Sequence, residues 1–460
     1  MLHRFLAVLA CLMLSGPLVA ATVINGAPGT FRLDDRGNAI DAHDGDLQYF
    51  NGRYYLYGTQ YGCGYQWNHK GAPFCGFRVY SSPDLATWHD EGALFDASTA
   101  VWQKRCDGST YGCYRPHVVF NARTHRYVLW TNSYDVGVGY HVFTSATPTG
   151  PFAEVALPTL AINTGLPPGL NHGDQDVFVD EDGVAYLAYT DWQKKGDIVV
   201  ERLDADYTSG TGSYVRMGLK ATEAPSMFRR GATYYLTYSD PNCGYCATGT
   251  SYLHATSPLG PWQGRKGATD PLHRGLPISK DSCGGQPADV AALPGDGGTM
   301  YLYQSDRWDR GAINEGLATQ FQEPLRFDAS GAILPLACAA TFPNPGAAAA
   351  SAVAVNVPVV PGKPVTLIVV RGEGEAAVRL PLYRHGDGAG TLRVSVHAMQ
   401  ADGKPGDLLG SHEFTTAQLS WSPRGESIRL AKDVPAGTRL AVTLEAEGGD
   451  AAFGALKPAP

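Results

Sequence analysis

The run Tyr54-Tyr55-Leu56-Tyr57 combines aromatic and aliphatic residues between turn-forming glycines, which is typical of a buried β-strand. Similar runs return four times along the chain, roughly 50 to 70 residues apart, which indicates a repeat architecture. The later copies are Tyr127-Val128-Leu129-Trp130, Tyr186-Leu187-Ala188-Tyr189, Tyr234-Tyr235-Leu236-Thr237 and Met300-Tyr301-Leu302-Tyr303. Three copies lead into another strand and a matching turn, so each unit predicts a small antiparallel sheet. Repeated sheets of this length favour an all-β, five-bladed β-propeller, with unrelated hairpins in a large sandwich as the alternative.

The composition supports a folded β-protein with two main domains. The 460 residues include 55 Gly, 31 Pro and 24 Tyr, and 44% are hydrophobic, which supplies both turn formers and core formers. Around Pro343-Asn344-Pro345-Gly346 the tyrosines nearly disappear and short valine-rich strands follow. We predict a signal peptide at 1–21, the propeller at 22–340, a linker at 341–350 and a small C-terminal β-sandwich at 351–460. The sandwich is interpreted as a stabilising accessory domain, with carbohydrate binding as the alternative.

The N-terminus has the pattern of an export signal, which predicts a secreted or periplasmic protein. Arg4 precedes the apolar stretch Phe5 to Leu14, and Val19-Ala20-Ala21 resembles a cleavage site. Removing it leaves eight cysteines, an even number that favours disulfides in an oxidising compartment. Two pairs are close enough to cross-link single loops, whereas the last four allow several pairings, and the CxxC pair also fits a zinc or redox site. In order these cysteines are Cys63 and Cys75, Cys106 and Cys113, then Cys243, Cys246, Cys283 and Cys338.

The charge balance argues against nucleic acid as a partner. Asp and Glu number 44 against 36 Lys and Arg, a formal net charge of −8, whereas polyanion binding draws on a basic surface. No segment after the signal is apolar over the ~20 residues needed to cross a bilayer, so a membrane partner is not expected either.

Aligning the repeats predicts a group of carboxylates at one end of the propeller axis. The first strand of every blade runs the same way along the axis, so Asp44, Asp174 and Glu223 would converge. Glycosidic cleavage uses two carboxyl groups, one to protonate the leaving oxygen and one to activate water. A third can raise the pKa of the acid by like-charge repulsion. The alternatives are that Asp44 is a turn residue and that Asp176 is a structural strand residue.

The chain resembles glycoside hydrolase family 43, the inverting five-bladed propellers. The resemblance spans about residues 38 to 335 and is carried by three motifs in order. They are Asp44 ahead of Asn51-Gly52-Arg53-Tyr54-Tyr55, Asp174 nine residues before Gly183, and Glu223-Ala224-Pro225 before Gly231-Ala232-Thr233-Tyr234-Tyr235. The resemblance implies Asp44 as general base, Asp174 as pKa modulator and Glu223 as general acid. No cofactor or metal is required for this chemistry, although a structural calcium ion stays open.

Within that family the sequence is similar to the branch of exo-β-1,3-galactanases, with two departures. That branch typically shows Ala-His-Gly-Gly-Gly, Glu-Arg-Pro-Lys and a Gln in the fifth blade. Here Asp44 replaces a Gly and Tyr114 replaces the substrate-contacting Glu, while Gln286 is retained. These departures favour an exo-acting furanosidase that releases arabinofuranose or galactofuranose from a polysaccharide or oligosaccharide. The predicted substrate-binding residues are His43, Trp67, Tyr114, Arg115, Asp176, Gln286 and Arg307.

Several other functions remain open at this point. Within the same family the alternatives are an exo-β-1,3-galactosidase and a β-xylosidase. A retaining fructan-active propeller would resemble Asn-Asp-Pro, Arg-Asp-Pro and Glu-Cys motifs, which His43-Asp44-Gly45, Gly173-Asp174-Gln175 and Glu223-Ala224 do not match. From another class, a non-catalytic glycan-binding propeller would have no reason to keep an acid, a base and a modulator together.

Overall fold

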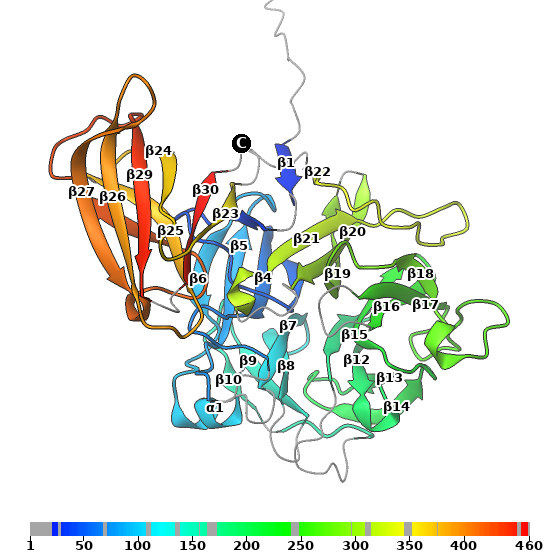
Figure 1. Ribbon diagram of the computed structural model, residues 1–460. Helices are drawn as coiled ribbons and strands as arrows, with labels where there is room; N and C mark the ends of the chain where they lie inside the picture. Colours follow the sequence, from blue (N-terminus) through cyan, green and yellow to red (C-terminus); the bar gives the residue numbers. More distant parts are fainter. Residues whose placement is uncertain are drawn as a thin grey trace, which may run out of the picture.

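The computed structural model is all-β, as the repeats predict (Figure 1). It describes residues 21–25, 29–67, 71–106, 112–133, 139–155, 157–162, 173–240, 248–295, 297–308, 314–344, 352–374, 376–448 and 452–458. Within these ranges the helical elements are α1 (Ala100–Arg105) and four single 3-10 turns. The turns are η1 (Trp192–Lys194), η2 (Pro271–His273), η3 (Glu315–Leu317) and η4 (Thr416–Gln418). Residues 1–20 of the predicted signal peptide, with Cys243 and Cys246, lie outside the described residues.

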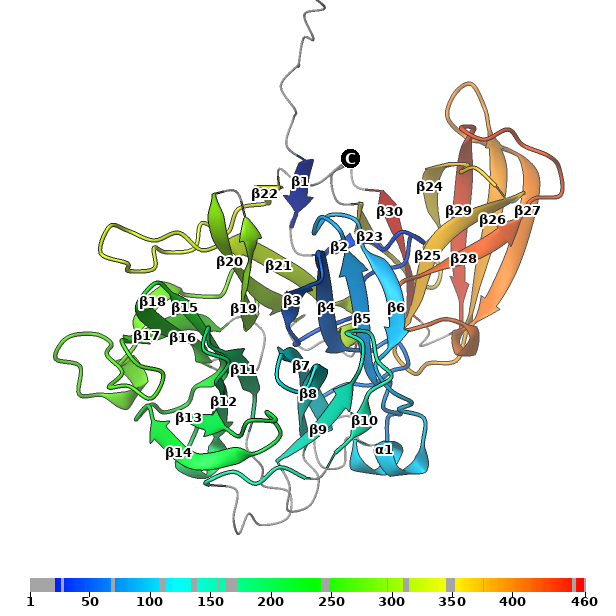
Figure 2. The same cartoon turned by 180° about the vertical axis from the view of Figure 1, so that it is seen from behind.

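Five antiparallel sheets follow one another along the chain (Figure 2). The first consists of β3 (Leu47–Phe50), β4 (Arg53–Thr59), β5 (Phe77–Ser82) and β6 (His89–Ala93). The second consists of β7 (Cys113–Asn121), β8 (Arg126–Ser133), β9 (Tyr140–Ser145) and β10 (Ala153–Glu154). The third consists of β11 (Gln175–Val179), β12 (Ala185–Asp191), β13 (Asp197–Leu203) and β14 (Gly210–Arg216). The fourth contains β15 (Glu223–Arg230), β16 (Thr233–Asp240), β17 (Gly249–Ala255) and β18 (Leu276–Ser279), and the fifth β19 (Gln286–Gly295), β20 (Gly298–Arg307) and β21 (Thr319–Pro324).

The repeated aromatic run is the second strand of each sheet, and its two faces pack in opposite directions. Tyr55 and Tyr57 belong to a hydrophobic cluster shared with the second sheet, whereas Leu56 belongs to one shared with the fifth sheet. This is the period-2 alternation of a strand that is buried on both sides. Corresponding clusters lie between the second and third, third and fourth, and fourth and fifth sheets. Each sheet therefore buries both faces against sheets next to it in sequence, and the fifth packs against the first.

Hydrogen bonds accepted by buried carboxylates connect the first strands of the first four sheets. The Val118 amide donates to Asp46 Oδ2 at 3.1 Å, which links β3 to β7. His117 Nδ1 lies 3.1 Å from Asp176 Oδ1, which links β7 to β11. The Met227 amide donates to Asp176 Oδ2 at 2.5 Å, which links β11 to β15. We call these ties and the next three the hydrogen-bond belt.

The belt continues through the fifth sheet and returns to the first. Ser226 Oγ donates to Asp289 Oδ1 at 2.9 Å and accepts the Val290 amide at 3.0 Å, which links β15 to β19. The Leu47 amide donates to Asp289 Oδ2 at 3.4 Å, which links β19 back to β3. Because buried polar groups are costly unless paired, these ties fix the first strands relative to one another.

Three disulfides are present among the described cysteines. Cys63 pairs with Cys75 and Cys106 pairs with Cys113, which confirms the two short-range pairings expected from spacing. The third joins Cys283 to Cys338, one of the pairings that the sequence left open.

Two further antiparallel sheets form the C-terminal part, and the N-terminal segment contributes to one of them. One sheet has the order β2 (Thr30–Arg32), β23 (Val353–Val359), β30 (Ala452–Pro458), β25 (Ala377–His385), β28 (Arg424–Arg429). The other has the order β24 (Val365–Val370), β29 (Arg439–Glu447), β26 (Thr391–Met399), β27 (Pro405–Thr415). Residues 30–32 fall inside the range 22–340 assigned to a propeller from sequence, but they pair with β23. In addition, β1 (Ala21–Ile24) pairs with β22 (Thr341–Asn344).

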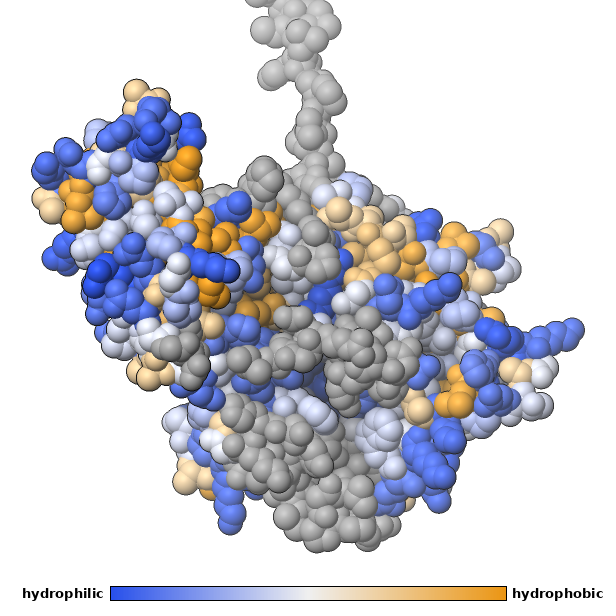
Figure 3. Space-filling model, viewed as in Figure 1, coloured by the Kyte–Doolittle hydropathy of each residue, from blue (hydrophilic) through white to orange (hydrophobic). Residues whose placement is uncertain are grey.

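Side chains from both C-terminal sheets share one hydrophobic cluster, including Val378 and Leu380 from one and Leu392 and Val442 from the other. On the face seen in Figure 3, hydrophobic residues gather where these sheets meet the rest of the molecule, and the outer side is mainly hydrophilic. No helix in the described part of the chain is both long and apolar enough to cross a membrane.

Candidate active site

The residues predicted to converge lie at the start of the first strands, just before the hydrogen-bond belt. Asp44 precedes β3, Arg115 lies near the start of β7, and Asp174 immediately precedes β11. Glu223 and Gln286 are the first residues of β15 and β19. Asp44, Arg115, Glu223 and Gln286 are buried, and Asp174 is partly buried.

Asp44 is held by hydrogen bonds on its backbone and on both carboxylate oxygens. Its amide donates to Asp306 Oδ2 at 2.7 Å. Thr59 Oγ1 donates to Oδ1 at 2.7 Å, and the Tyr61 hydroxyl donates to Oδ2 at 3.2 Å. The residue has a φ of 53°, in the left-handed region that non-glycine residues seldom occupy. The surrounding bonds thus hold a strained conformation in place, a situation common at functional sites.

The pKa of Asp44 is raised from its ordinary 3.8 to about 6. Burial is the largest cause because it removes water from the charged form. The Arg115 charge and the Thr59 hydrogen bond lower the pKa in part, and the nearby Asp306 and Asp174 carboxylates raise it. A carboxylate with a pKa of about 6 is still ionised at neutral pH and can accept a proton from water.

His43 is buried beside Asp44, and its ring faces two other carboxylates. Nδ1 lies 3.2 Å from Asp306 Oδ1, whereas Nε2 lies 3.6 Å from Asp41 Oδ1, beyond hydrogen-bond distance. Burial acts to lower the pKa of His43, but the hydrogen bond to Asp306 and the charges of Asp306, Asp41 and Asp44 raise it overall. The imidazole therefore anchors Asp306, which in turn holds the Asp44 amide.

Arg115 places one positive charge among the three predicted catalytic carboxylates. Its Nη2 lies 3.0 Å from Asp174 Oδ2, an ion pair rather than a directed hydrogen bond. Its Nη1 donates to the carbonyl of Pro287 at 3.2 Å, at the start of the fifth sheet. Burial opposes the charge, but Asp174, then Asp44 and Glu223, raise the pKa of Arg115 above its ordinary value. The guanidinium thus lies within electrostatic reach of carboxylates from the first, third and fourth sheets.

Glu223 is hydrogen bonded to Gln286, whose orientation is fixed by an indole. Gln286 Nε2 donates to Glu223 Oε1 at 2.7 Å, and Trp308 Nε1 donates to Gln286 Oε1 at 3.1 Å. An indole nitrogen only donates, so the amide must present its NH₂ group to Glu223. Gln286 therefore orients the Glu223 carboxyl group through its NH₂ group.

The structure places some predicted substrate-binding residues away from this group. Asp176 lies one layer deeper, where both carboxylate oxygens are engaged in the hydrogen-bond belt. Arg307 donates from Nε to the Cys283 carbonyl at 3.0 Å, and its guanidinium lies 4.8 Å from the centre of the Phe321 ring.

The two predicted aromatic contacts lie nearer the group. Tyr114 is buried and stacks on Tyr65, with ring centres 5.5 Å apart. Trp67 is 43% exposed, and its amide donates to Glu315 Oε2 at 3.0 Å. Within the described ranges, no group of three or more His, Cys, Asp or Glu side chains is placed to hold a metal ion.

Sequence reasoning missed four residues around Asp44, namely Thr59, Tyr61, Asp306 and Glu315. Asp306 could have been found from strand pairing because it lies opposite Gln286 in the register of β19 and β20. Neighbours in a strand face opposite sides, so the Arg307 side chain leaves β20 on the side opposite to Asp306. Glu315 lies in a separate turn after β20, and no repeat or spacing pointed to it.

The family model of glycosyl hydrolases family 43 matches residues 39–308, which is more than half of the chain. The chain belongs to glycosyl hydrolase family 43. It is therefore a glycoside hydrolase, as the three motifs and the grouped carboxylates predict.

Similar proteins include enzymes acting on galactose-containing glycans. A β-D-galactofuranosidase of Aspergillus niger, xynD, is 25% identical over 302 residues, covering 64% of this chain and 82% of that protein. An exo-β-1,3-galactanase from Clostridium thermocellum superposes with a TM-score of 0.58 at 19% identity, covering 93% of this chain and 100% of that one. One from Phanerochaete chrysosporium, solved with β-1,3-galactotriose, has a TM-score of 0.56 at 19% identity, with 95% and 100% covered. At these identities the two solved structures support the fold alone.

Proposed function

We propose that this enzyme is an inverting exo-glycosidase that removes terminal furanosyl sugars, with Asp44 as general base, Glu223 as general acid and Asp174 as pKa modulator. The observation that carries the proposal is that the carboxyl groups of Asp44 and Glu223, both within electrostatic reach of the Arg115 guanidinium, have different hydrogen-bond partners. Asp44 accepts two side-chain hydroxyls, which favour its charged form. Glu223 accepts the neutral Gln286 amide, and a carboxyl group can accept such a bond in its protonated form as well as in its charged form. Pairs of carboxyls in different environments are how glycosidases divide acid and base roles.

In this mechanism the ionised Asp44 takes a proton from the attacking water, and Glu223 gives its proton to the leaving oxygen. Thr59 and Tyr61 orient the base through its two oxygens. Gln286 donates to Oε1 of the acid and orients its carboxyl group towards the leaving oxygen. Arg115 holds Asp174 beside them and limits the repulsion among three carboxylates. Attack by water on the face opposite the leaving group inverts the anomeric configuration.

The architecture and export of the enzyme are part of the proposal. The five sheets are taken as the blades of a five-bladed propeller because the hydrogen-bond belt runs from β3 through all five first strands and returns to β3. The two C-terminal sheets are taken as a β-sandwich because they share one hydrophobic cluster. The three disulfides support an oxidising compartment and therefore export through the N-terminal signal.

The choice of a furanosyl substrate rests on two residues and one relative. Asp44 supplies a carboxylate base where the galactanase-like motif has Gly, and Tyr114 stands where that motif has a substrate-contacting Glu. The relative that acts on galactofuranose is 25% identical to this chain. The second candidate is an exo-β-1,3-galactosidase, favoured by Gln286 and its contact with the predicted acid.

A panel of aryl glycosides tests the substrate class and the mechanism together. We expect turnover of β-D-galactofuranosides or α-L-arabinofuranosides above β-D-galactopyranosides and β-D-xylosides, with NMR showing inversion in the first-formed sugar. Preference for galactopyranosides would support the second candidate, and retention of configuration would overturn the mechanism. Binding without turnover on every glycoside would instead identify a glycan-binding protein.

A pair of glutamate variants tests the general acid. Glu223→Gln should slow glycosides with poor leaving groups far more than activated ones, because only the former need protonation. Glu201→Gln is the matched control, since Glu201 is a buried carboxylate in β13 that accepts the Ala161 amide and the Tyr189 hydroxyl away from this group. An equal loss on both leaving groups in the Glu223 variant would contradict the assignment.

A further inference from the structure

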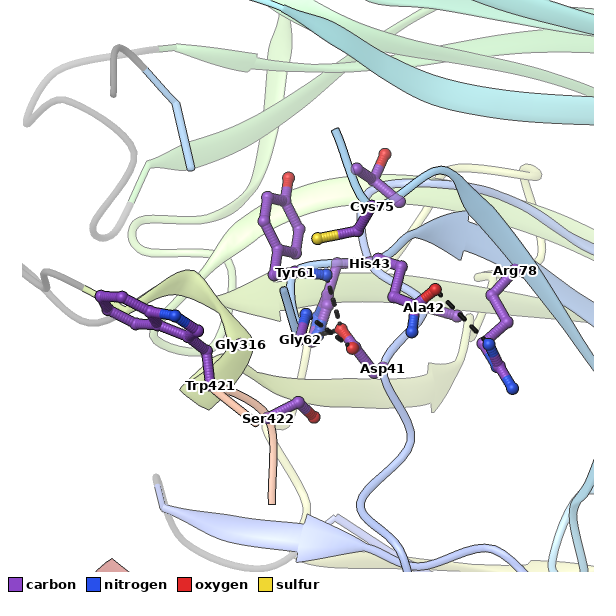
Figure 4. Close-up of polar contacts among 12 residues, drawn as sticks. Asp41, Ala42, His43, Tyr61, Gly62, Cys75, Arg78, Gly316, Trp421 and Ser422 are labelled. Atoms are coloured by element: carbon purple, nitrogen blue, oxygen red, sulfur yellow. Dashed lines mark hydrogen bonds and ion pairs between the residues drawn. The ribbon is translucent and has the colours of Figure 1, made fainter. Parts of the chain in front are cut away.

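A loop of the C-terminal part lies against the segments that carry the candidate active site (Figure 4). This loop, residues 420–425, begins shortly after η4 and runs into β28. We call it the C-terminal loop. Its Trp421 is buried, with 6% of the residue exposed, although it lies at the edge of the C-terminal sheets rather than in their hydrophobic cluster.

The first contact of the C-terminal loop leads to Asp44 in a few steps. The Trp421 amide donates to the Gly62 carbonyl at 3.0 Å, and Ser420 Oγ donates to the same oxygen at 2.8 Å. The amides of Tyr61 and Gly62 each donate to one oxygen of Asp41 at 2.9 Å, as Figure 4 shows. Tyr61, fixed in this way, donates its hydroxyl to Asp44 Oδ2. The C-terminal loop thus supports the backbone of a residue that orients the base.

The Trp421 indole fills the space beside the same segment. Gly64 has a φ of 98°, and a Cβ atom there would lie 2.7 Å from Trp421 Nε1. Only glycine fits both that backbone conformation and that close approach. On its other side the indole is covered by Arg384, whose guanidinium lies 4.9 Å from the ring centre. The side chain is therefore matched in shape to the Tyr61–Trp67 segment.

The second contact leads to Glu315. Asn314 Nδ2 donates to the Trp421 carbonyl at 2.7 Å, and Asn314 Oδ1 accepts the Gly316 amide at 3.0 Å. Glu315 between them accepts the Trp67 amide through Oε2 at 3.0 Å. This turn and the Tyr61–Trp67 segment are consequently tied to each other as well as to Trp421.

The third contact is with the segment that leads into Asp44. The Ala39 amide donates to the Pro423 carbonyl at 3.0 Å, and the Gly425 amide donates to Asn38 Oδ1 at 3.0 Å. Two residues after Ala39 comes Asp41, which holds the amides of Tyr61 and Gly62. Three separate segments around Asp44 therefore depend on one loop of the C-terminal part.

We propose that the C-terminal loop is a positioning element of the active site, with Trp421 as its central positioning residue. The proposal rests on the proposed function, in which Asp44 is the base. Trp421 does not act on the substrate; it fixes Tyr61 on Asp44 and Glu315 on Trp67. The C-terminal part is then required for catalytic geometry, beyond the accessory role expected from sequence.

A pH profile reports this role because Tyr61 stabilises the ionised form of Asp44. Loosening the Tyr61–Trp67 segment weakens that hydrogen bond and shifts the equilibrium of Asp44 towards the protonated form. Other charged and titratable groups within electrostatic reach of Asp44 or its partners are His43, Arg115, Asp174, Asp306, Glu315, Tyr61, Tyr65 and Tyr114. None of them lies on the C-terminal loop, so the loop acts through position rather than charge.

The experiment compares Trp421→Ala with Leu392→Ala in the full-length protein. Leu392 is fully buried in the cluster between the C-terminal sheets, so its loss destabilises the same part of the protein without touching the loop. For Trp421→Ala we expect the acid limb of kcat/KM to move up by about one pH unit, the size of one weakened hydrogen bond to a charged group, and kcat/KM at pH values below the limb to fall about tenfold. Leu392→Ala should leave both unchanged at a temperature where it is folded. Equal kinetic effects in the two variants, or an unchanged profile in Trp421→Ala, would overturn the proposal.

A second variant with a smaller perturbation, and hydrogen exchange as a measurement that does not depend on activity, complete the test. Ser420→Ala removes one hydrogen bond to the Gly62 carbonyl and should produce the same changes at reduced size. Hydrogen exchange at the amides of Gly62 and Trp67 should be faster in the Trp421 and Ser420 variants than in Leu392→Ala. Unchanged exchange would refute positioning even if no glycoside is turned over. Faster exchange in the Trp421 and Ser420 variants, together with a wild-type protein that turns over no glycoside, would overturn the proposed function and keep the structural coupling.

Discussion

Replacing Thr59 by valine should move the acid limb of the pH–activity profile towards neutral pH. Thr59 Oγ1 donates a 2.7 Å hydrogen bond to Asp44 Oδ1, and this bond is one of the interactions that lower the pKa of Asp44. Valine keeps the branched shape and removes the hydroxyl, so the perturbation is the loss of one donor. Thr59 is fully buried, which leaves no route for bulk water to replace the bond cheaply.

The expected size follows from the energy of such bonds. A hydrogen bond to a charged group contributes about 1.5–3 kcal/mol, and one pKa unit corresponds to about 1.4 kcal/mol. Losing the Thr59 bond should therefore raise the pKa of Asp44 from about 6 to about 7 or 8. At pH 6.5 about three quarters of the base is ionised in the wild type and about a tenth in a variant with a pKa near 7.5. Activity at that pH should fall about eightfold and recover as the pH rises.

The assay is kcat/KM against pH on an activated aryl glycoside, because this ratio reports the pKa of the free enzyme's base. The control is Thr237→Val in β16, the corresponding strand of the fourth sheet, where the buried hydroxyl donates to the Ser226 carbonyl at 3.3 Å. This control should leave the acid limb in place. An acid limb that stays in place in Thr59→Val, or moves to lower pH, would refute the assignment of Asp44 as the titrating base.

Further predictions concern stability and rate. Asp44→Asn should be inactive yet more stable than wild type at pH 7.5 by up to about 3 kcal/mol, and equal in stability to wild type near pH 4. The reason is that the raised pKa of Asp44 makes the wild-type protein lose stability as the pH rises from about 4 through 6. Urea unfolding of both proteins at the two pH values measures this difference. Burial raises the pKa of Asp46 to about 8, so the Tm of Asp46→Asn should fall less than that of wild type between pH 6 and 9. Asp44→Ala should lose about 10²–10⁴ in rate and recover in part with azide, as an external nucleophile replaces activated water. Gln286→Ala should lose only several-fold in rate, since one neutral hydrogen bond contributes about 1 kcal/mol. An inactive Gln286→Ala beside an active Asp44→Ala would show that Gln286, and not Asp44, is needed to activate water.

The sheet repeat was predictable because a strand buried on both faces has a distinctive composition. Leu56 packs against one neighbouring sheet and Tyr55 and Tyr57 against another, so apolar side chains are needed at successive positions. The same logic predicted that Asp44, Arg115 and Glu223 lie together, since each repeat places one residue at the same end of its first strand. Local spacing also decided two disulfides, because only short loops connect those cysteines.

The parts that escaped prediction depend on contacts between distant segments. Asp306 becomes part of the site only because β20 pairs with β19 in a particular register, and this register cannot be derived from the sequence pattern alone. Glu315 is placed by Asn314, whose own partners belong to residues 70 and 107 positions away in the chain. No periodicity in the sequence encodes such contacts, so the residues that support Asp44 could be identified only from the tertiary structure.

One backbone feature accounts for the separation between the group around Asp44 and the belt beneath it. Strand pairing is interrupted by irregularities at Tyr114 to His117, at Glu223 to Ser226 and at Pro287 to Val290. Such bulges occur next to active sites, where they re-aim a side chain. Arg115 in the first irregularity and Ala224 in the second have a positive φ, in the left-handed region.

The bulge lets one strand serve two purposes at successive depths. At its beginning, Arg115 in β7 or Glu223 in β15 lies near the other candidate catalytic residues. After it, His117 or Ser226 ties its strand to the next sheet in the hydrogen-bond belt. A substitution that straightens the bulge would move both groups together, so the geometry of the candidate catalytic residues is coupled to the ties that hold the sheets in place.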